Sequence, residues 1–103
     1  MAESAREFFE GIEARVDPRK TRGETASYRF DVAPAGSWHV DVDNGRVTVE
    51  ESAKDADCVI AASEDDFLKI VRGEQNPTVA YMTGKLKVKG DVGLALKLQK
   101  LFF

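Results

Sequence analysis

The sequence predicts an α+β fold in which helices cover one face of a five-stranded mixed sheet. Three runs of alternating apolar and polar residues lie between positions 26 and 51, separated by tight turns, which is typical of an antiparallel meander. Helical segments separate two later strand candidates, which favours one mixed sheet with its helices on one side. With 103 residues the chain is long enough for one domain and too short for two, so we expect a single domain over residues 1–103.

The chain begins with a predicted amphipathic helix over residues 3–16. Its apolar residues recur at helical spacing, at Ala5, Phe8, Phe9, Ile12 and Val16. Pro18 follows closely, and because proline disfavours helical backbone at the residue before it, we expect the helix to end there. Residues 17–24 are rich in charge and are expected to form a loop.

The strands of the meander are predicted at residues 26–32, 37–43 and 46–51. Their inward side chains are Ala26, Tyr28, Phe30, Val32, Trp38, Val40, Val42, Val47 and Val49. Asn44-Gly45 joins the second run to the third. This pair is a strong hairpin signal, because a type I′ turn needs two residues that tolerate positive φ.

The next segment is predicted to be a strand followed by a helix. The nearly all-apolar run at residues 57–62 indicates an interior strand with both faces covered. Ser63 and the three acidic residues after it form a helix start, since a hydroxyl caps the first N–H groups and acids suit the positive end of the helix dipole. We expect this helix to end at Gly73.

The last part of the chain is predicted to contain two more helices around the fifth strand. Asn76-Pro77 begins a helix that ends at Gly84, with the cap followed by proline at the first helical position. The strand follows at residues 85–89, and a last helix runs from Asp91 to the C-terminus. This last helix is apolar on more than one side, so we expect a ligand or a protein interface to cover what the core does not.

The formal net charge of −3 hides an asymmetry along the chain. Residues 84–103 carry five lysines and one aspartate, whereas the others carry ten basic and seventeen acidic residues. A basic, apolar end on an acidic body suits an anionic membrane surface or an anionic head group, although a solvated strand and helix face would have the same composition. Nucleic acid is not expected as a partner, because the basic residues are few and the aromatic ones are not interleaved with them.

No motif for a phosphate loop, a dinucleotide site, a nucleophile elbow or a metal-binding helix pair is present. His39, Asp41 and Asp43 share one face of a strand, but neighbours two apart lie about 7 Å apart with parallel side chains, so we expect no metal there. Cys58 lies in the most apolar strand and is expected to be buried and inert. We therefore predict no catalytic residue, no cofactor and no metal.

Six segments, taken in order, form a recognisable set. They are Gly36-Ser-Trp38, Val42-Asp43-Asn44-Gly45, Asp57-Cys58-Val59-Ile60, Phe67-Leu-Lys-Ile-Val-Arg-Gly73, the stretch from Pro77 to Gly84, and Lys85-Leu86-Lys87-Val88-Lys89-Gly90-Asp91. Together they resemble the sterol carrier protein 2 family over about residues 25–102, the last segment being the most specific. The resemblance implies a sheet covered by helices on one face, with a hydrophobic tunnel between them. Such a tunnel takes sterols, fatty acids, fatty acyl-CoA or phospholipids without covalent chemistry.

We therefore expect a non-catalytic module that binds a lipid or acyl ligand and can transfer it. The residues expected to line the tunnel are Trp38, Val40, Phe67, Ile70, Val79, Met82, Leu86, Leu94, Leu98, Leu101 and Phe102. Lys85, Lys97 and Lys100 are expected to face a head group or an anionic membrane surface. A dry cavity of about 300 Å³ would cost on the order of 7 kcal/mol, so we expect the tunnel to be lipid-filled or partly collapsed, with a last helix that moves.

Two alternatives remain open, and the oligomeric state is not predicted. The chain could be a structural or dimerisation module whose apolar C-terminal helix forms a protein interface. It could also be an enzyme with a hydrophobic pocket, which would need a general acid or base among Asp31, His39 and Tyr81. The N-terminus does not resemble a secretory signal, and Lys100-Leu-Phe-Phe103 is not a peroxisomal address, so we expect a cytoplasmic, prokaryotic protein.

Overall fold

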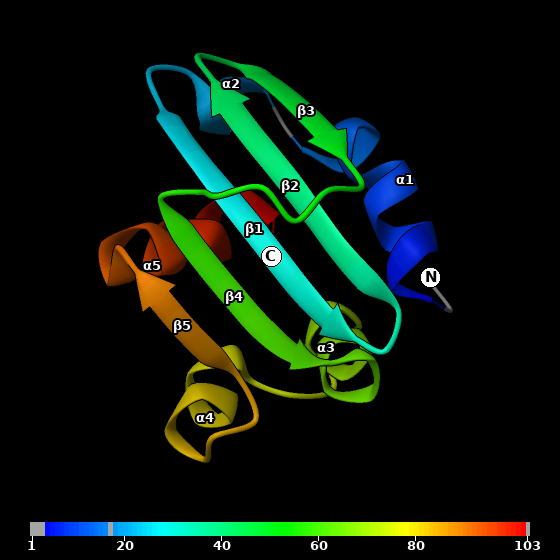
Figure 1. Ribbon diagram of the computed structural model, residues 1–103. Coiled ribbons are helices and arrows are strands. Elements are labelled where there is room, and N and C mark those ends of the chain that lie inside the picture. The colour runs from blue at the N-terminus through cyan, green and yellow to red at the C-terminus, as the bar shows by residue number, and fades with distance from the viewer. Residues whose placement is uncertain (1–3, 17, 103) are drawn as a thin grey trace.

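The computed structural model describes residues 4–16 and 18–102 (Figure 1). Its helices and strands are α1 (Ala5–Arg15), α2 (Pro18–Thr21), β1 (Thr25–Ala33), β2 (Gly36–Asp43), β3 (Arg46–Glu50), β4 (Cys58–Ser63), α3 (Glu64–Val71), α4 (Pro77–Met82), β5 (Lys87–Gly90) and α5 (Val92–Phe102). The strands form one sheet and the helices lie behind it in the view of Figure 1. The predicted α+β fold, with helices on one face of a five-stranded sheet, is confirmed.

The sheet has the strand order β3-β2-β1-β4-β5. The first three strands form the predicted antiparallel meander, β4 pairs with β1 in parallel, and β5 pairs with β4 antiparallel. β4 is therefore an interior strand, as predicted, but the prediction that both of its faces are covered is wrong. Its outward side chains, those of Val59 and Ala61, are only half-buried, because the helices cover the opposite face.

The connection from β3 to β4 crosses the face of the sheet that carries no helices (Figure 1). Arg29 holds this connection by donating a hydrogen bond from Nη1 to the carbonyl oxygen of Ala53, at 3.1 Å. Ser27 and Asp57 exchange two further hydrogen bonds, of 2.9 and 3.3 Å.

His39 lies on the same helix-free face and is only 6% exposed, near Glu50 and Lys54. The prediction that His39 is solvated is therefore wrong. Asp41 and Asp43 are exposed, as predicted.

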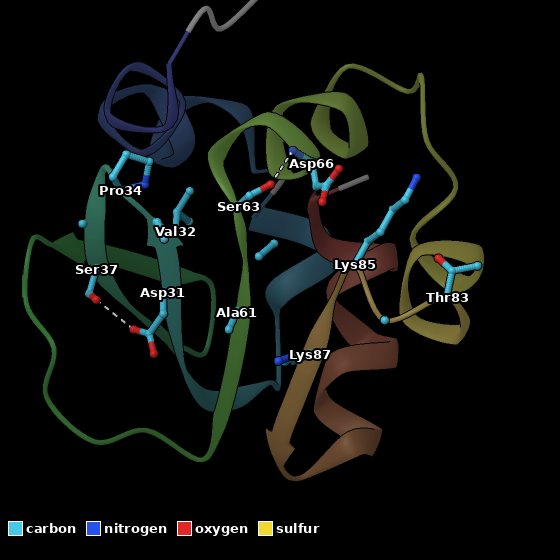
Figure 2. Close-up of a pocket in the computed structure, with 14 residues that line it drawn as sticks. Asp31, Val32, Pro34, Ser37, Ala61, Ser63, Asp66, Thr83, Lys85 and Lys87 are labelled. Carbon is cyan, nitrogen blue, oxygen red and sulfur yellow. Dashed lines mark hydrogen bonds between the residues drawn. The ribbon is translucent and has the colours of Figure 1, made fainter.

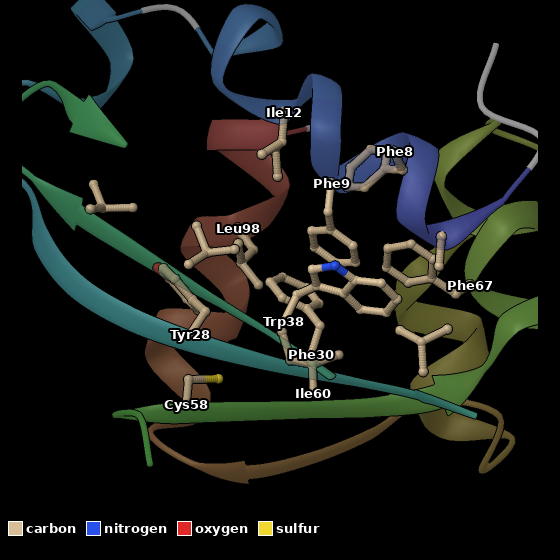
Figure 3. Packing of buried hydrophobic residues seen from close by; sticks show 14 of the residues in the cluster. Phe8, Phe9, Ile12, Tyr28, Phe30, Trp38, Cys58, Ile60, Phe67 and Leu98 are labelled. Carbon is tan, nitrogen blue, oxygen red and sulfur yellow. The ribbon is translucent and has the colours of Figure 1, made fainter. Parts of the chain in front are cut away.

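On the helix-covered face, aromatic rings from α1, β1, β2 and α3 form the centre of the core (Figure 3). Phe9 of α1 stacks on Trp38 with their ring centroids 4.8 Å apart and on Phe67 at 5.4 Å. Two more rings complete the group. The ring centroid of Phe30 lies 5.1 Å from that of Phe9, and the ring centroid of Phe8 lies 5.4 Å from that of Phe67. α1 is thus attached to the sheet by ring packing, and the aromatic pairs contribute about 0.5–1.5 kcal/mol each beyond their burial.

Most element boundaries differ from the predictions by one or two residues, and two differences have a clear physical reason. The expected loop at residues 17–24 contains the short helix α2, because Pro18 suits a first helical turn, where its missing N–H is not needed. The buried Thr21 then accepts hydrogen bonds at its carbonyl from Glu24 and Gly45. The fifth strand begins at Lys87 and not at residue 85, since the N–H groups of residues 85 and 86 both donate to the carbonyl oxygen of Ala80 in α4.

The contact between Gly90 and the start of β4 yields a stability prediction. Gly90 has φ +88°, and a Cβ atom there would overlap the carbonyl oxygen of Asp57, which accepts a hydrogen bond from the N–H of Asp91. We expect Gly90→Ala to lower the free energy of unfolding by about 3 kcal/mol or more, measured by urea denaturation. Gly23→Ala is the matched control, because Gly23 has φ +80° with open space around it, and it should cost about 1–2 kcal/mol. Equal losses in the two variants would contradict the proposed overlap.

Candidate functional site

An apolar pocket of about 130 Å³ lies between the helix-covered face of the sheet and α3, α4 and α5. It is lined by Phe30, Ile60, Phe67, Ile70, Pro77, Thr78, Tyr81, Leu86, Val88, Val92, Ala95, Leu96 and Leu98. None of these side chains carries a charge, and the only polar ones are the hydroxyl-bearing Thr78 and Tyr81. We call this cavity the apolar pocket.

The floor of the apolar pocket follows from the register of three neighbouring strands. Phe30 of β1 is paired with Ile60 of β4, and Ile60 is paired with Val88 of β5. Because successive residues of a strand point to opposite faces, these three side chains form one row on the helix-covered side. Phe67 and Ile70 of α3 are both buried and close one end of this row.

The opening of the pocket lies between α4 and α5. Tyr81 of α4 and Val92 and Leu96 of α5 line the pocket and yet are about half exposed or more, with Leu96 at 63%. The side chains deeper in the pocket, such as Phe30 and Leu98, are buried. Solvent-exposed apolar residues therefore surround the entrance to an uncharged interior.

The two helices at the opening are held with different strength. Leu98 anchors α5 in the core, and the hydroxyl of the fully buried Tyr28 donates a hydrogen bond to the carbonyl of Leu94 at 3.2 Å (Figure 3 shows Tyr28 beside Leu98). Burial raises the pKa of Tyr28 to about 12. α4, in contrast, has six residues and buries only Ala80.

Four of the residues predicted to line a tunnel are on the wall of the apolar pocket: Phe67, Ile70, Leu86 and Leu98. Trp38 and Val40 lie in the core, because β2 is one strand further from the pocket and α1 covers Trp38. Leu94 is half-buried against the core on the side of Tyr28.

Val79 and Met82 are exposed, at 49% and 78%, because α4 turns Ala80 inward and leaves them on its outer side. The side chains of Leu101 and Phe102 lie outside the described residues. Eight residues of the pocket wall were not predicted from the sequence: Phe30, Ile60, Pro77, Thr78, Val88, Val92, Ala95 and Leu96. Phe30, Ile60 and Val88 lie on strands, and the period-two alternation of the sequence indicates which face of the sheet they occupy. It does not indicate that their three strands are neighbours, which is what brings them together in the pocket.

Of the three lysines expected at the entrance, the two whose side chains the structure describes do not lie there. Lys85 lines a separate, open groove of about 710 Å³ at the ends of β1 and β4, together with Lys87 (Figure 2). The ammonium of Lys97 pairs with the carboxylate of Glu24 at 3.1 Å. The side chain of Lys100 lies outside the described residues.

Candidate acid–base residues are likewise dispersed. Asp31 lines the groove at the ends of β1 and β4, where it accepts hydrogen bonds from Arg29 at 3.1 Å and from the Ser37 hydroxyl at 2.8 Å (Figure 2). His39 is buried on the same outer face, whereas Tyr81 is on α4 behind the sheet. Of the three candidates for the general acid or base that the enzyme hypothesis requires, Tyr81 lines the apolar pocket, whereas Asp31 and His39 do not.

Cys58 is fully buried, as predicted, and burial raises the pKa of its thiol to about 11. A thiol with so high a pKa is almost entirely protonated at neutral pH and is a poor nucleophile.

Among the residues that the structure describes, no three His, Cys, Asp or Glu side chains are grouped so as to hold a metal ion. None of the helices in the described part of the chain is both long and apolar enough to cross a bilayer.

Comparison with models of protein families shows to which family this chain belongs. Residues 9–103 match the model of the SCP-2 sterol transfer family. The chain belongs to this family. The family resemblance predicted from the sequence motifs is thereby confirmed.

Relatives are found both as parts of longer proteins and as separate domains. The chain is 39% identical over 99 residues to hydroxysteroid dehydrogenase-like protein 2 of Xenopus tropicalis and 38% identical over 102 residues to human sterol carrier protein 2. The two matches include 92% and 90% of this chain, but only 24% and 19% of the length of the two relatives, respectively. The chain therefore spans about a quarter or less of the curated relatives it matches.

Solved structures show the same fold at full domain length. The palmitated SCP2L2 of Aedes aegypti superimposes with a TM-score of 0.75 and 27% identity, covering 94% of this chain and 92% of that one. The apo form of sterol carrier protein 2 from Yarrowia lipolytica gives a TM-score of 0.72 and 28% identity, covering 92% and 89%.

The buried Tyr28 and Cys58 yield a prediction for alkaline pH. Their pKa values are raised from about 10 to about 12 and from about 9 to about 11, so their neutral forms stabilise the fold fully below pH 9, and this stabilisation is lost as pH rises to 12. We expect the free energy of unfolding to fall across this range. Because the chain has two tyrosines, the phenolate absorbance of Tyr28→Phe should lack the component with a midpoint near pH 12. Complete ionisation of both tyrosines before pH 11 would show that Tyr28 is not sequestered.

Proposed function

We propose that this chain binds a fatty acid, fatty acyl-CoA, phospholipid or sterol non-covalently in the apolar pocket and transfers it. The observation that carries the proposal is the uncharged wall of a pocket that opens between two helices. Burying a methylene group away from water contributes about 0.8 kcal/mol, so eight buried methylenes would contribute roughly 6 kcal/mol before the costs of association. Membership of the SCP-2 sterol transfer family supports the same ligand class.

The pocket has to widen to take such a ligand. Its volume of about 130 Å³ is well below the roughly 300–1,000 Å³ that ligand pockets of drug size occupy. α5 is anchored by Leu98 and by the Tyr28 hydrogen bond, whereas α4 buries only Ala80. We therefore infer that α4 moves outward to admit the ligand, in place of the last helix, which the sequence analysis expected to move.

The proposed role is binding and not catalysis. Catalysis would depend on Tyr81, because Asp31 and His39, the other two candidates for a general acid or base, do not line the apolar pocket. The names of the longer relatives, including the hydroxysteroid dehydrogenase-like proteins, describe proteins of which this chain matches about a quarter or less. The single domain over residues 1–103 and the cytoplasmic, prokaryotic setting stay predictions.

A pocket-filling substitution tests the proposal. Ala95 of α5 is half-buried and lines the apolar pocket, so Ala95→Phe places a phenyl ring inside it without adding charge. We expect the wild-type chain to take up palmitate, observed as a mass shift in native mass spectrometry. The variant should bind it at least about tenfold more weakly, a loss of about 1.4 kcal/mol. Palmitate is chosen because one structural relative is a palmitated form.

Ala14→Phe is the matched control, since Ala14 is an exposed alanine near the end of another helix, α1. It should bind palmitate as the wild type does. Failure of the wild-type chain to take up palmitate, acyl-CoA, phospholipid or cholesterol would overturn the proposed function. Equal affinity in Ala95→Phe and wild type would show that the ligand lies elsewhere.

A further inference from the structure

The groove at the ends of β1 and β4 and the apolar pocket are formed by neighbouring residues of the same segments. In the segment that leads into β5, Lys85 lines the groove and Leu86 lines the apolar pocket. In α3, Asp66 lines the groove and Phe67 lines the pocket. The two cavities are therefore adjacent at the place where β4 ends and β5 begins.

The hydrogen-bonded ladder between β4 and β5 ends at this place. Its last pair is Ala61 and Lys87. Beyond this pair, the N–H groups of Lys85 and Leu86 donate to the carbonyl oxygen of Ala80, so the connection into β5 is bonded to α4. The outward movement of α4 inferred above would carry this connection away from the end of β4. The apolar pocket would then be continuous with the groove.

Charges of both signs line the groove, and they come from different elements (Figure 2). Lys85 and Lys87 belong to the segment of β5, whereas Asp66 belongs to α3. Among the described residues, no carboxylate pairs with either lysine and no cation pairs with Asp66. The fourth charged residue of the lining, Asp31, is already paired with Arg29 at 3.1 Å. The groove thus has one cationic and one anionic side whose charges are not used within the described part of the fold.

Hydroxyl groups accompany the carboxylate of Asp66. Ser63 and Thr83 also line the groove, and the Ser63 hydroxyl accepts a hydrogen bond from the N–H of Asp66 at 3.1 Å. Carboxylate and hydroxyl oxygens suit a primary ammonium group, which has three N–H donors. A quaternary ammonium group has no such donor and is recognised by aromatic rings, and none of the described residues that line the groove is aromatic.

We propose that the groove binds the phosphoethanolamine head group of an acyl lipid whose chain lies in the apolar pocket. The phosphate pairs with Lys85 and Lys87, and the primary ammonium group donates hydrogen bonds to the carboxylate of Asp66. Both contacts are charge-assisted, and hydrogen bonds of this kind are shorter and stronger than those between neutral groups. The inference rests on the proposed function and narrows its ligand class to one kind of head group.

The other ligands of the proposed class match the groove less well. A fatty acid has a negative charge only and a sterol has no charge, so neither pairs with both sides of the groove. A fatty acyl-CoA carries several phosphates, and those near Asp66 would meet a charge of the same sign, which is unfavourable. A phosphocholine head group supplies the phosphate but no N–H donor for Asp66.

The experiment titrates the full chain with single-chain lipids by native mass spectrometry. The probes are palmitoyl-lysophosphatidylethanolamine, palmitoyl-lysophosphatidylcholine and hexadecanol, which has a chain of the same length and no charge. We expect the wild type to bind the ethanolamine lipid at least about fivefold more tightly than the choline lipid. Equal affinity for these two lipids would overturn the proposal. Free phosphoethanolamine should bind at least about tenfold more weakly than the ethanolamine lipid, and equal affinity would show that the groove binds a water-soluble compound and not a lipid.

Two variants separate the two sides of the groove. Asp66→Asn should abolish the preference for the ethanolamine lipid, because it removes the negative charge that faces the ammonium group. Asp65→Asn is its matched control, since Asp65 lies in the same turn of α3, is exposed and does not line the groove, and it should keep the preference. Lys85→Gln/Lys87→Gln should bind both phospholipids at least about fivefold more weakly, because it removes the charges that face the phosphate.

Lys69→Gln/Lys89→Gln removes the same charge at two exposed lysines outside the groove and should lose less than about twofold. Hexadecanol should bind alike to the wild type and all variants. An equal loss for hexadecanol in the groove variants would overturn the proposal, because they would then act on the pocket and not on the head group. Wild-type affinities in the groove variants would overturn it as well. Uptake of palmitate or hexadecanol without any head-group preference would overturn the head-group site alone, whereas failure to take up any lipid would count against the proposed function.

Discussion

The parallel pairing of β1 with β4 is the constraint on which the rest of the structure depends. A parallel partner cannot be reached by a tight turn, so the chain has to cross from β3 at one edge to the far side of β1. It does so over the helix-free face, where Arg29 and Ser27 hold it. That crossing leaves the other face to the helices. The same pairing sets Phe30 beside Ile60, and β5 extends the row to Val88, so the floor of the apolar pocket is a product of strand register.

The space between sheet and helices is filled in two different ways. Beneath α1, five aromatic rings with neighbouring centroids 4.8 to 6.1 Å apart leave the core closed. Beneath α4 and α5, mostly aliphatic side chains meet a six-residue helix that buries one alanine, and a cavity remains. A dry cavity of about 130 Å³ costs about 3 kcal/mol at roughly 24 cal/mol per Å³. A domain with a total stability of about 5–15 kcal/mol tolerates that cost, but not that of a wide empty tunnel.

Local sequence patterns predict most elements of this fold because alternation, caps and turns act over a few residues. Ser63 and Asn76 cap α3 and α4 as predicted, and Asn44 adopts the positive φ expected of the hairpin turn. Local patterns do not predict the residues that line the apolar pocket, because the lining depends on which strands become neighbours in the sheet. Trp38 alternates in the same way as Phe30, yet β2 lies away from β4 and its tryptophan enters the aromatic core. In α4 the apolar spacing cannot tell that Ala80, and not Met82, faces inward.

The lysines of the last segment have two physical explanations that can be separated by position. Lys87 and Lys89 project from β5, an edge strand, and charged residues there prevent pairing with another sheet edge. The opposite edge, β3, serves the same purpose with Arg46 and Glu50, charges of both signs. Edge protection therefore does not require that every charge on β5 be positive, and it has no bearing on lysines outside the strand. Away from the strand, the ammonium of Lys97 pairs with Glu24 at 3.1 Å and Lys85 lines the groove at the ends of β1 and β4, so the described lysines are dispersed over the surface and do not gather at the pocket entrance.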